Sequence, residues 1–131
     1  MDLNPALQTF IAESSELLEQ MEQSLLQLEN DSGNRELLDA VFRAAHTIKG
    51  SAGVFGFDSI VSFTHQVETL LDRLRNGEVP LSSKLSALLL RCGDHMAALI
   101  VPATSDAPAP AGLRENDAAL SAELADFIDA G

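Results

Sequence analysis

Tryptophan and tyrosine are absent from this 131-residue chain, and cysteine occurs only once. The single thiol, Cys92, cannot form an internal disulfide, and its apolar neighbours indicate a buried side chain that packs as a small hydrophobe. Aliphatic residues and the six phenylalanines must therefore supply the hydrophobic core. Because 46% of the residues are apolar, a chain of this length can bury one core and is expected to form one domain.

Basic residues are scarce. Eight Lys and Arg stand against twenty Asp and Glu, which gives a formal charge of −12. A nucleic-acid-binding protein needs clustered Lys and Arg to neutralise phosphates, so this class is excluded, and binding to an anionic membrane surface is disfavoured for the same reason. An acidic surface suits partners that present Lys or Arg, although solubility alone explains it equally well.

Long hydrophobic runs and targeting segments are also missing. No unbroken apolar run approaches the ~20 residues of a membrane-spanning helix. The first residues, Met1-Asp2-Leu3-Asn4-Pro5, lack the basic and apolar regions of a secretory signal. We therefore expect a cytoplasmic protein without membrane insertion.

Apolar residues recur at three- and four-residue steps, and no alternating strand pattern competes with them. The first predicted helix has Asn4 as its N-cap and Pro5 at its first position, and it ends at the turn-forming residues 30–34. Further helices are predicted from about residue 35 to 54, from after Gly56 to about 75, and from about 81 to 101. The short turns between them predict an all-α, antiparallel up-down four-helix bundle over residues 1–101.

The last quarter of the chain changes in composition. Residues 102–112 contain three of the five prolines and are predicted to form a Pro/Ala-rich loop. Apolar residues then recur through residues 113–131, which predicts an additional C-terminal helix. This helix could dock on the bundle or extend as a tether, and we expect it to dock.

One face of the second predicted helix does not belong to the core. At 100° per residue, its apolar residues occupy an arc roughly 160° to 260° from His46, whereas Lys49, Gly50 and Gly53 lie within roughly 60° of it. The imidazole of His46 is therefore predicted to point into solvent. Glycine costs about 1 kcal/mol in a helix relative to alanine, so the two glycines suggest a bare strip that lets a second protein approach. Gly53 could instead belong to a C-terminal cap.

The third predicted helix offers partners for His46. In an antiparallel hairpin, Glu68 lies about as far from the turn as His46, and it could accept the N–H of one ring nitrogen, fix the tautomer and leave Nε2 as nucleophile. Lys49, three residues after His46, could offset phosphate charge, or it could be a solvated lysine. His65 could join the cluster or be an ordinary surface histidine. His95 has no comparable neighbours in the sequence, so we assign it no role.

These residues form a recognisable pattern. Residues 42–57 read Phe-Arg-Ala-Ala-His-Thr-Ile-Lys-Gly-Ser-Ala-Gly-Val-Phe-Gly-Phe, and residues 63–68 read Phe-Thr-His-Gln-Val-Glu. Residues 71–78 and the opening Ile11-Ala12-Glu13-Ser14 add to the pattern. Over about residues 10–100 the chain resembles the histidine phosphotransfer (HPt) domain at the N-terminus of CheA-type chemotaxis histidine kinases. Many relatives have Gly-Gly where this chain has Gly50-Ser51, and Ser51 lies off the exposed strip.

The resemblance implies a role in two-component chemotaxis signalling. A separate ATP-binding kinase domain would phosphorylate His46, which would pass the phosphoryl group to an aspartate of a CheY- or CheB-like receiver docked over the strip. The resemblance also implies that His46, Lys49, His65 and Glu68 form one hydrogen-bonded cluster. No nucleotide-binding motif is visible, so the domain should be a substrate and carrier rather than an enzyme and should bind no cofactor. The resemblance also implies a monomer when the domain is isolated, since dimerisation belongs to a different domain in this family.

Two other classes of protein compete with this interpretation. A metal-binding bundle could use His46, His65 and Glu68, but the paired Glu-x-x-His segments of di-metal bundles are missing and Lys49 would repel a cation. We therefore expect no metal. A purely structural helical adaptor explains the bundle and the acidity, but it leaves the exposed strip without a reason.

Overall fold

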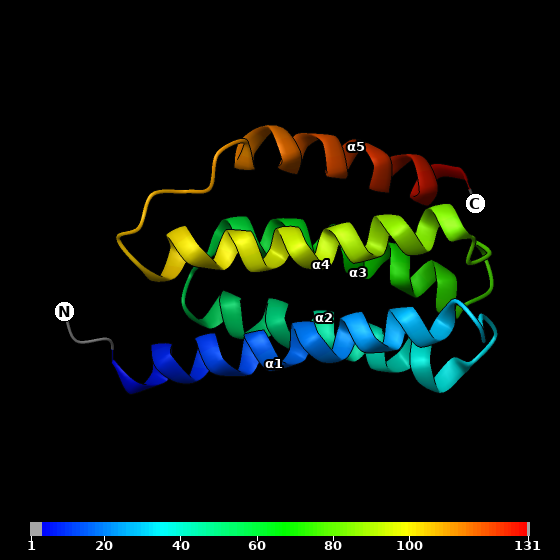
Figure 1. The fold of residues 1–131 in the computed structure, drawn as a ribbon, viewed down its shortest axis with the longest axis horizontal. Helices are drawn as coiled ribbons and strands as arrows, with labels where there is room; N and C mark the ends of the chain where they lie inside the picture. Colours follow the sequence, from blue (N-terminus) through cyan, green and yellow to red (C-terminus); the bar gives the residue numbers. More distant parts are fainter. Residues whose placement is uncertain (1–3, 131) are drawn as a thin grey trace.

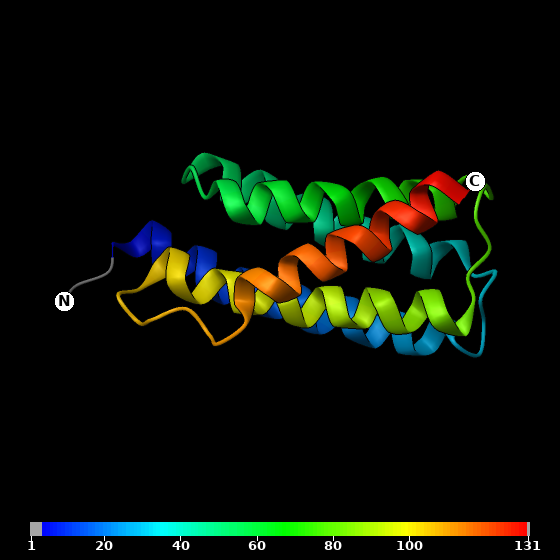
Figure 2. The ribbon, with the colours of Figure 1, turned by 90° about the horizontal axis from the view of Figure 1, so that it is seen from above.

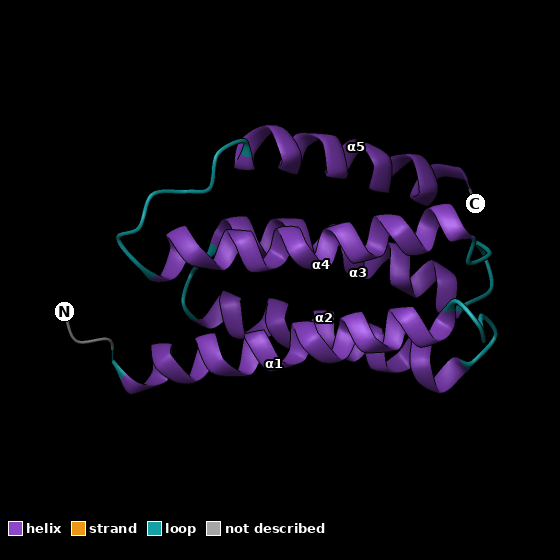
Figure 3. Ribbon diagram, in the orientation of Figure 1, coloured by secondary structure: helices purple, strands orange, loops and turns teal. Residues whose placement is uncertain are grey.

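A computed structural model of the chain describes residues 4–130. These residues form five helices and no strand (Figures 1 and 3), which confirms the all-α prediction. The helices are α1 (Pro5–Leu28), α2 (Arg35–Val54), α3 (Asp58–Arg75), α4 (Ser83–Thr104) and α5 (Leu113–Ala130). The predicted bundle includes residues 1–3, and the predicted C-terminal helix includes residue 131. These four residues lie outside the described residues, as does the start of the segment that was expected not to be a secretory signal.

Side-chain caps begin three of the helices. Asn4 Oδ1 accepts a hydrogen bond from the Leu7 N–H at 2.7 Å and Pro5 occupies the first position, as predicted for α1. Asn34 caps α2 and Ser82 caps α4 in the same way. These bonds satisfy N–H groups that the first turn of a helix leaves without a partner, and so they fix where each helix starts.

A tight turn joins α2 to α3 and sets their antiparallel pairing. Gly56 adopts a φ of +73°, a conformation that favours glycine, and the Phe57 N–H donates back to the carbonyl of Ala52 at 3.0 Å. Phe55 and Phe57 stack at this end of the bundle with ring centroids 5.4 Å apart, and each also contacts Phe10 of α1 at 5.5 Å. The turn is therefore anchored by packing as well as by its backbone.

Helices α1 to α4 run up and down around a square, so that α1 packs against α2, α2 against α3, α3 against α4, and α4 against α1. The fifth helix lies outside this square, along α3 and α4 (Figures 1 and 2). Buried aliphatic side chains fill the centre, and Cys92 is among them at 0% exposure. Burial raises the pKa of the Cys92 thiol to about 12, so this group stays neutral and packs as a hydrophobe.

The fourth helix begins at Ser83 rather than at about residue 81, and it ends three residues later than the sequence indicated. Pro102 lies inside α4, which continues to Thr104, so the predicted loop at 102–112 begins only after residue 104. Pro102 lacks the N–H that would bond to the carbonyl four residues before it, but only two helical residues follow it, so the missing bond lies in the last turn. The hydroxyl of Thr104 donates to the Ile100 carbonyl at 2.7 Å and that of Ser105 donates to the Val101 carbonyl at 2.7 Å, which satisfies carbonyls at the helix end.

By length and composition alone, α4 could also span a membrane. The sequence did not indicate this, because polar residues interrupt the apolar run of this helix. Half of its most apolar window is buried inside the bundle, however. A core helix of a folded domain has the same composition, so the finding is accounted for by packing.

The contact between α4 and α5 corrects the expectation for His95. This side chain has 0% exposure, and its Nε2 lies 2.8 Å from Oδ1 of Asp117 in α5. Its Nδ1 lies 3.2 Å from the side-chain amide of Asn116, and the Phe63 ring packs edge-on against it at 4.6 Å. His95 therefore joins α4 to α5 through buried polar contacts, whereas the sequence suggested no partner for it.

Candidate functional site

The hairpin of α2 and α3 brings His46 and Glu68 together on the outside of the bundle. Nδ1 of His46 lies 2.8 Å from Oε2 of Glu68, a hydrogen-bond distance. The His46 side chain is 63% exposed, whereas that of Glu68 is only 12% exposed. The structure thus holds a solvent-facing imidazole against a largely covered carboxylate. The helical wheel predicted the outward imidazole and the antiparallel hairpin predicted the contact, whereas the covering of Glu68 was not predicted.

The other oxygen of the same carboxylate is bound to Lys49. The Lys49 ammonium donates to Oε1 of Glu68 at 2.7 Å, and its side chain is 22% exposed. Glu68 therefore bridges two residues that lie three positions apart on α2. In this arrangement the lysine fixes the carboxylate and, at the same time, places a positive charge beside the imidazole.

Electrostatics keep this carboxylate ionised. Burial alone would raise the pKa of Glu68, but the hydrogen bonds from Lys49 and His46, together with their charges, outweigh that effect and hold the pKa below its ordinary value of 4.5. An ionised carboxylate can only accept hydrogen bonds. The Nδ1 atom of His46 must then carry its proton toward Glu68, which leaves the lone pair of the neutral ring on Nε2.

Two residues that the sequence analysis did not single out support the imidazole. The ring of Phe42 is stacked on that of His46, with an interplanar angle of 8° and centroids 6.0 Å apart. The guanidinium of Arg75 lies 3.8 Å from the centre of the Phe42 ring and contacts Asp39 and Asp72 at 3.3 and 3.1 Å. The four-residue step from Phe42 to His46 was visible in the sequence, but the position of Arg75 depends on how α3 packs.

The predicted bare strip is present beside His46. Gly50 and Gly53 are both exposed, and a Cβ added at either position would meet no atom within 4 Å. The left-handed residue after α2 is Gly56, and its N–H donates to the Gly53 carbonyl at 3.1 Å, so Gly53 takes part in the C-terminal cap through its backbone. Val54, next to the strip, is 84% exposed. This end of α2 thus offers an open, partly apolar approach to the imidazole.

The structure does not bring His65 into the cluster. Its side chain is exposed, and its backbone carbonyl accepts a hydrogen bond from the Thr69 hydroxyl at 3.0 Å. Within residues 4–130 its imidazole makes no side-chain hydrogen bond with another residue. The same part of the chain contains no group of three or more His, Cys, Asp or Glu side chains that could hold a metal ion.

Known proteins are similar to this chain in both sequence and fold. A sequence model of the Hpt domain matches residues 5–100. The chain is 48% identical over 96 residues to the chemotaxis protein CheA of Salmonella typhimurium, which covers 73% of this chain and 14% of that protein. It is 37% identical over 100 residues to CheA of Bacillus subtilis, covering 76% of this chain and 15% of that protein. The chain therefore spans only about one seventh of the length of these relatives.

Solved structures of CheA domains have a similar fold. The phosphorylated P1 domain of CheA3 in complex with CheY6 from R. sphaeroides superposes with a TM-score of 0.84 at 25% identity, over 97% of this chain and 98% of that one. The CheA phosphotransferase domain from Thermotoga maritima gives a TM-score of 0.71 at 34% identity, over 76% of this chain and 94% of that one. Because the domain model covers α1 to α3 and most of α4 and the folds coincide, the chain belongs to the Hpt domain family.

Proposed function

We propose that this domain carries a phosphoryl group on Nε2 of His46 in a chemotaxis phosphorelay. The lone pair of Nε2 attacks the γ-phosphorus of an ATP held by a separate CheA-type kinase domain, a P–N bond forms, and the bond to the departing ADP breaks. A carboxylate oxygen of a CheY- or CheB-like receiver then attacks the same phosphorus. The P–N bond breaks and its electron pair returns to Nε2.

Glu68 and Lys49 assist this chemistry from fixed positions. Glu68 accepts the Nδ1 proton of His46 and stabilises the positive charge that the ring gains when Nε2 is bonded to phosphorus. Lys49, bound to the same carboxylate, supplies a nearby positive charge for the phosphoryl oxygens. Gly50 and Gly53 leave the approach open to the receiver and to the kinase domain.

The observation that carries this proposal is the 2.8 Å contact between His46 Nδ1 and Glu68 on an imidazole that remains 63% exposed. A buried histidine would not be reached by a second protein, and an unpaired one would not be held in one tautomer. The relatives support the proposal, since one structural neighbour is described as a phosphorylated P1 domain in complex with CheY6.

The domain alone is then a substrate and carrier, and the ATP chemistry belongs to the kinase domain. We expect it to be cytoplasmic, monomeric when isolated, and free of a resident cofactor or metal. A purely structural adaptor would share the fold but would carry no phosphoryl group.

The test is phosphorylation by a purified CheA catalytic domain with γ-labelled ATP. We expect one acid-labile, base-stable label, which His46→Gln abolishes while the far-UV circular dichroism signal stays unchanged. His65→Gln is the matched control, because it removes an exposed imidazole outside the cluster and should label normally. Persistent labelling of His46→Gln would assign the site elsewhere. Phosphorus NMR of the labelled protein should report substitution at Nε2.

A further inference from the structure

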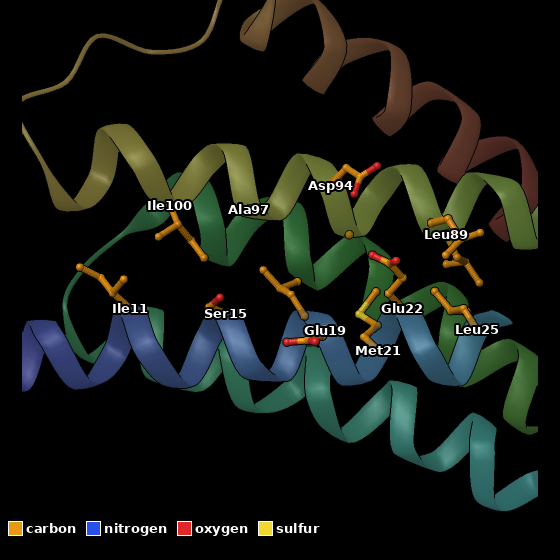
Figure 4. Close-up of a pocket in the computed structure, with 13 residues that line it drawn as sticks. Ile11, Ser15, Glu19, Met21, Glu22, Leu25, Leu89, Asp94, Ala97 and Ile100 are labelled. Carbon is orange, nitrogen blue, oxygen red and sulfur yellow. The ribbon is translucent and has the colours of Figure 1, made fainter. Parts of the chain in front are cut away.

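The edge of the bundle formed by α1 and α4 carries a groove that the phosphotransfer chemistry does not use. A cavity of about 340 Å³ lies between the two helices (Figure 4). In the square of helices this edge is opposite the α2–α3 edge that holds His46 and Glu68. A molecule bound in the groove would therefore leave the imidazole accessible.

Small residues on the two helices create the groove, and apolar side chains form its floor. Gly93 and Ala97 of α4 and Ser15 of α1 line it, and a Cβ added at Gly93 would lie 4.0 Å from the Met21 side chain. Met21 and Leu25 are each 1% exposed, so the floor is part of the core itself. The groove is thus a permanent depression between two rigid helices.

Exposed apolar residues extend this surface at both ends. Leu26 is 44% exposed and Val101 is 40% exposed. Leu26 follows the groove residue Glu22 by about one turn of α1, and Val101 follows Ala97 by about one turn of α4. Because α1 and α4 are antiparallel, the two residues lie at opposite ends. From Ile11 to Leu26 the surface is about 22 Å long, which matches four turns of a helix.

The rim of the groove is acidic. Glu19 and Glu22 of α1 and Asp94 of α4 line it (Figure 4), and none of the three forms an ion pair with another residue in the described range 4–130. The 24 residues of α1 include no Lys or Arg. An occupant with positive charges beside its apolar face would therefore be complementary to the rim.

The neighbouring groove shows what this bundle accepts. The groove between α3 and α4 is covered by α5, which inserts Leu120 and Leu124 at 1% and 0% exposure. At its edge, Arg91 of α4 pairs with Glu123 of α5 through two hydrogen bonds of 2.9 and 2.8 Å. An amphipathic helix with a charged margin thus fits the outside of this four-helix square, and no helix within residues 4–130 covers the α1–α4 groove in this way.

We propose that the α1–α4 groove is a docking site for an amphipathic helix of a partner protein with Lys or Arg flanking its apolar face. Helices bind grooves of this kind through apolar residues spaced three and four positions apart. A second copy of this chain is disfavoured as the occupant, because it would place one acidic rim against another.

The test uses a designed 18-residue helical peptide with leucines on one face and lysines beside them, followed by fluorescence anisotropy. A matched peptide with glutamates in place of the lysines is the control ligand. We expect the lysine peptide to bind the folded chain and the glutamate peptide to bind at least about fivefold more weakly. In NMR titrations, shifts should gather on α1 and α4 and leave Glu68 and its neighbours unperturbed.

Variants of the chain separate this site from general attraction to an acidic protein. Glu22→Lys and Asp94→Lys should each weaken binding about fivefold or more, whereas Asp126→Lys, an equal charge change on the exposed face of α5, should have a smaller effect. Gly93→Leu should block binding by filling the groove. Equal loss with Asp126→Lys, unaltered binding with the groove variants, or NMR shifts centred on α2 and α3 would overturn the proposal. Phosphorylation of His46 should be unaffected by all of these changes, so the two proposals fail independently.

Discussion

At the scale of single residues, the Glu68 carboxylate holds the site together, because both of its oxygens are hydrogen-bonded to site residues. Its two oxygens bind His46 and Lys49 at 2.8 and 2.7 Å, so the tautomer of the imidazole and the position of the ammonium depend on one side chain. The carboxylate is 12% exposed, and water cannot fully replace it. Removing its charge should therefore affect chemistry more than folding.

Glu68→Gln should slow phosphorylation of His46 by about ten- to a hundredfold, the usual effect of losing the residue that orients an imidazole. The amide keeps an oxygen acceptor but loses the charge that stabilises the phosphorylated ring. The measurement is the initial rate of labelling by a CheA catalytic domain, with the far-UV spectrum as a check on folding. An unchanged rate would remove Glu68 from the mechanism.

Because the pKa of Glu68 is depressed in the folded protein, its contribution to stability depends on pH. The stabilisation is fully present above the ordinary carboxylate pKa of 4.5 and is lost as the pH falls through the lower folded-state value. The difference in unfolding free energy between the parent chain and Glu68→Gln should therefore be larger at about pH 5.5 than at about pH 3.5.

Urea unfolding at these two pH values is the measurement. Glu16→Gln is the matched control, since Glu16 is exposed and forms no ion pair with another residue within 4–130. Its effect should be smaller at both pH values. A Glu68→Gln difference that grows as the pH falls would mean that the carboxylate is not held in its ionised form.

Much of this site could be predicted because it depends on local geometry. The 100° step of a helix placed His46, Lys49, Gly50 and Gly53 on one outer face, and the short hairpin placed Glu68 opposite the imidazole. The position of His65 could not be settled in this way. Its spacing from Glu68 is helical, but the direction of an exposed side chain at the edge of a face depends on how α2 and α3 pack.

At the scale of elements, the exposed face of α2 is kept bare at a cost in helix stability. Gly50→Leu should raise the unfolding free energy by roughly 0.5–1 kcal/mol, because leucine is the better helix former and nothing lies within 4 Å of the new Cβ. The same side chain should slow phosphotransfer to a CheY-like receiver by filling the approach.

Stopped-flow transfer from the phosphorylated domain to the receiver would measure this effect. Thr47→Leu is a suitable control, because residue 47 is exposed on the same helix about 100° away from His46. Stabilisation together with unaltered transfer in Gly50→Leu would indicate that the receiver docks on another face.

The junction of α4 and α5 depends on a buried polar group. Asp117→Ala should lower the unfolding free energy by about 1–3 kcal/mol, because it leaves the buried Nε2 of His95 without its 2.8 Å partner. The exposed Asp126 on the same helix provides the control, and Asp126→Ala should change stability by less than about 0.5 kcal/mol. Equal effects of the two substitutions would mean that the contact with His95 contributes nothing.

The contacts at this junction could not be predicted from the sequence. The partners of His95 lie in α5, more than twenty residues away and beyond a Pro-rich loop, so no periodicity within α4 could reveal them. The loop was predicted to start at Pro102, but α4 continues for two more residues, and the hydroxyls of Thr104 and Ser105 satisfy the carbonyls of Ile100 and Val101 at its end. Both errors concern long-range packing or helix ends rather than helical pattern.

At the scale of the whole molecule, the outer surfaces of the four-helix square differ in what they present to solvent. The α2–α3 edge presents the imidazole, α5 lies over α3 and α4 (Figure 2), and no helix among residues 4–130 covers the α1–α4 groove. The model of the Hpt domain matches residues 5–100 and so ends before α5. The four-helix square should therefore be the unit that folds and is phosphorylated, with α5 as a stabilising addition.

A chain shortened to end at Ser105 tests this division. It loses the burial of Leu120 and Leu124, which are 1% and 0% exposed. Burying one leucine stabilises a protein by about 1.5–3 kcal/mol, so the unfolding free energy should fall by roughly 3–6 kcal/mol. Labelling of His46 should survive at low temperature, because its partners Glu68 and Lys49 come from α2 and α3 alone.

Chemical denaturation and kinase labelling of the same samples would measure both effects. Leu124→Ala in the full chain is the control, and it should show an intermediate loss of about 2–5 kcal/mol while α5 remains attached. If the shortened chain were as stable as the full one, α5 would not be docked in solution. If the shortened chain stayed folded but was labelled poorly, α5 would influence the phosphorylation site through α3, which contacts both α5 and the His46-bearing helix α2.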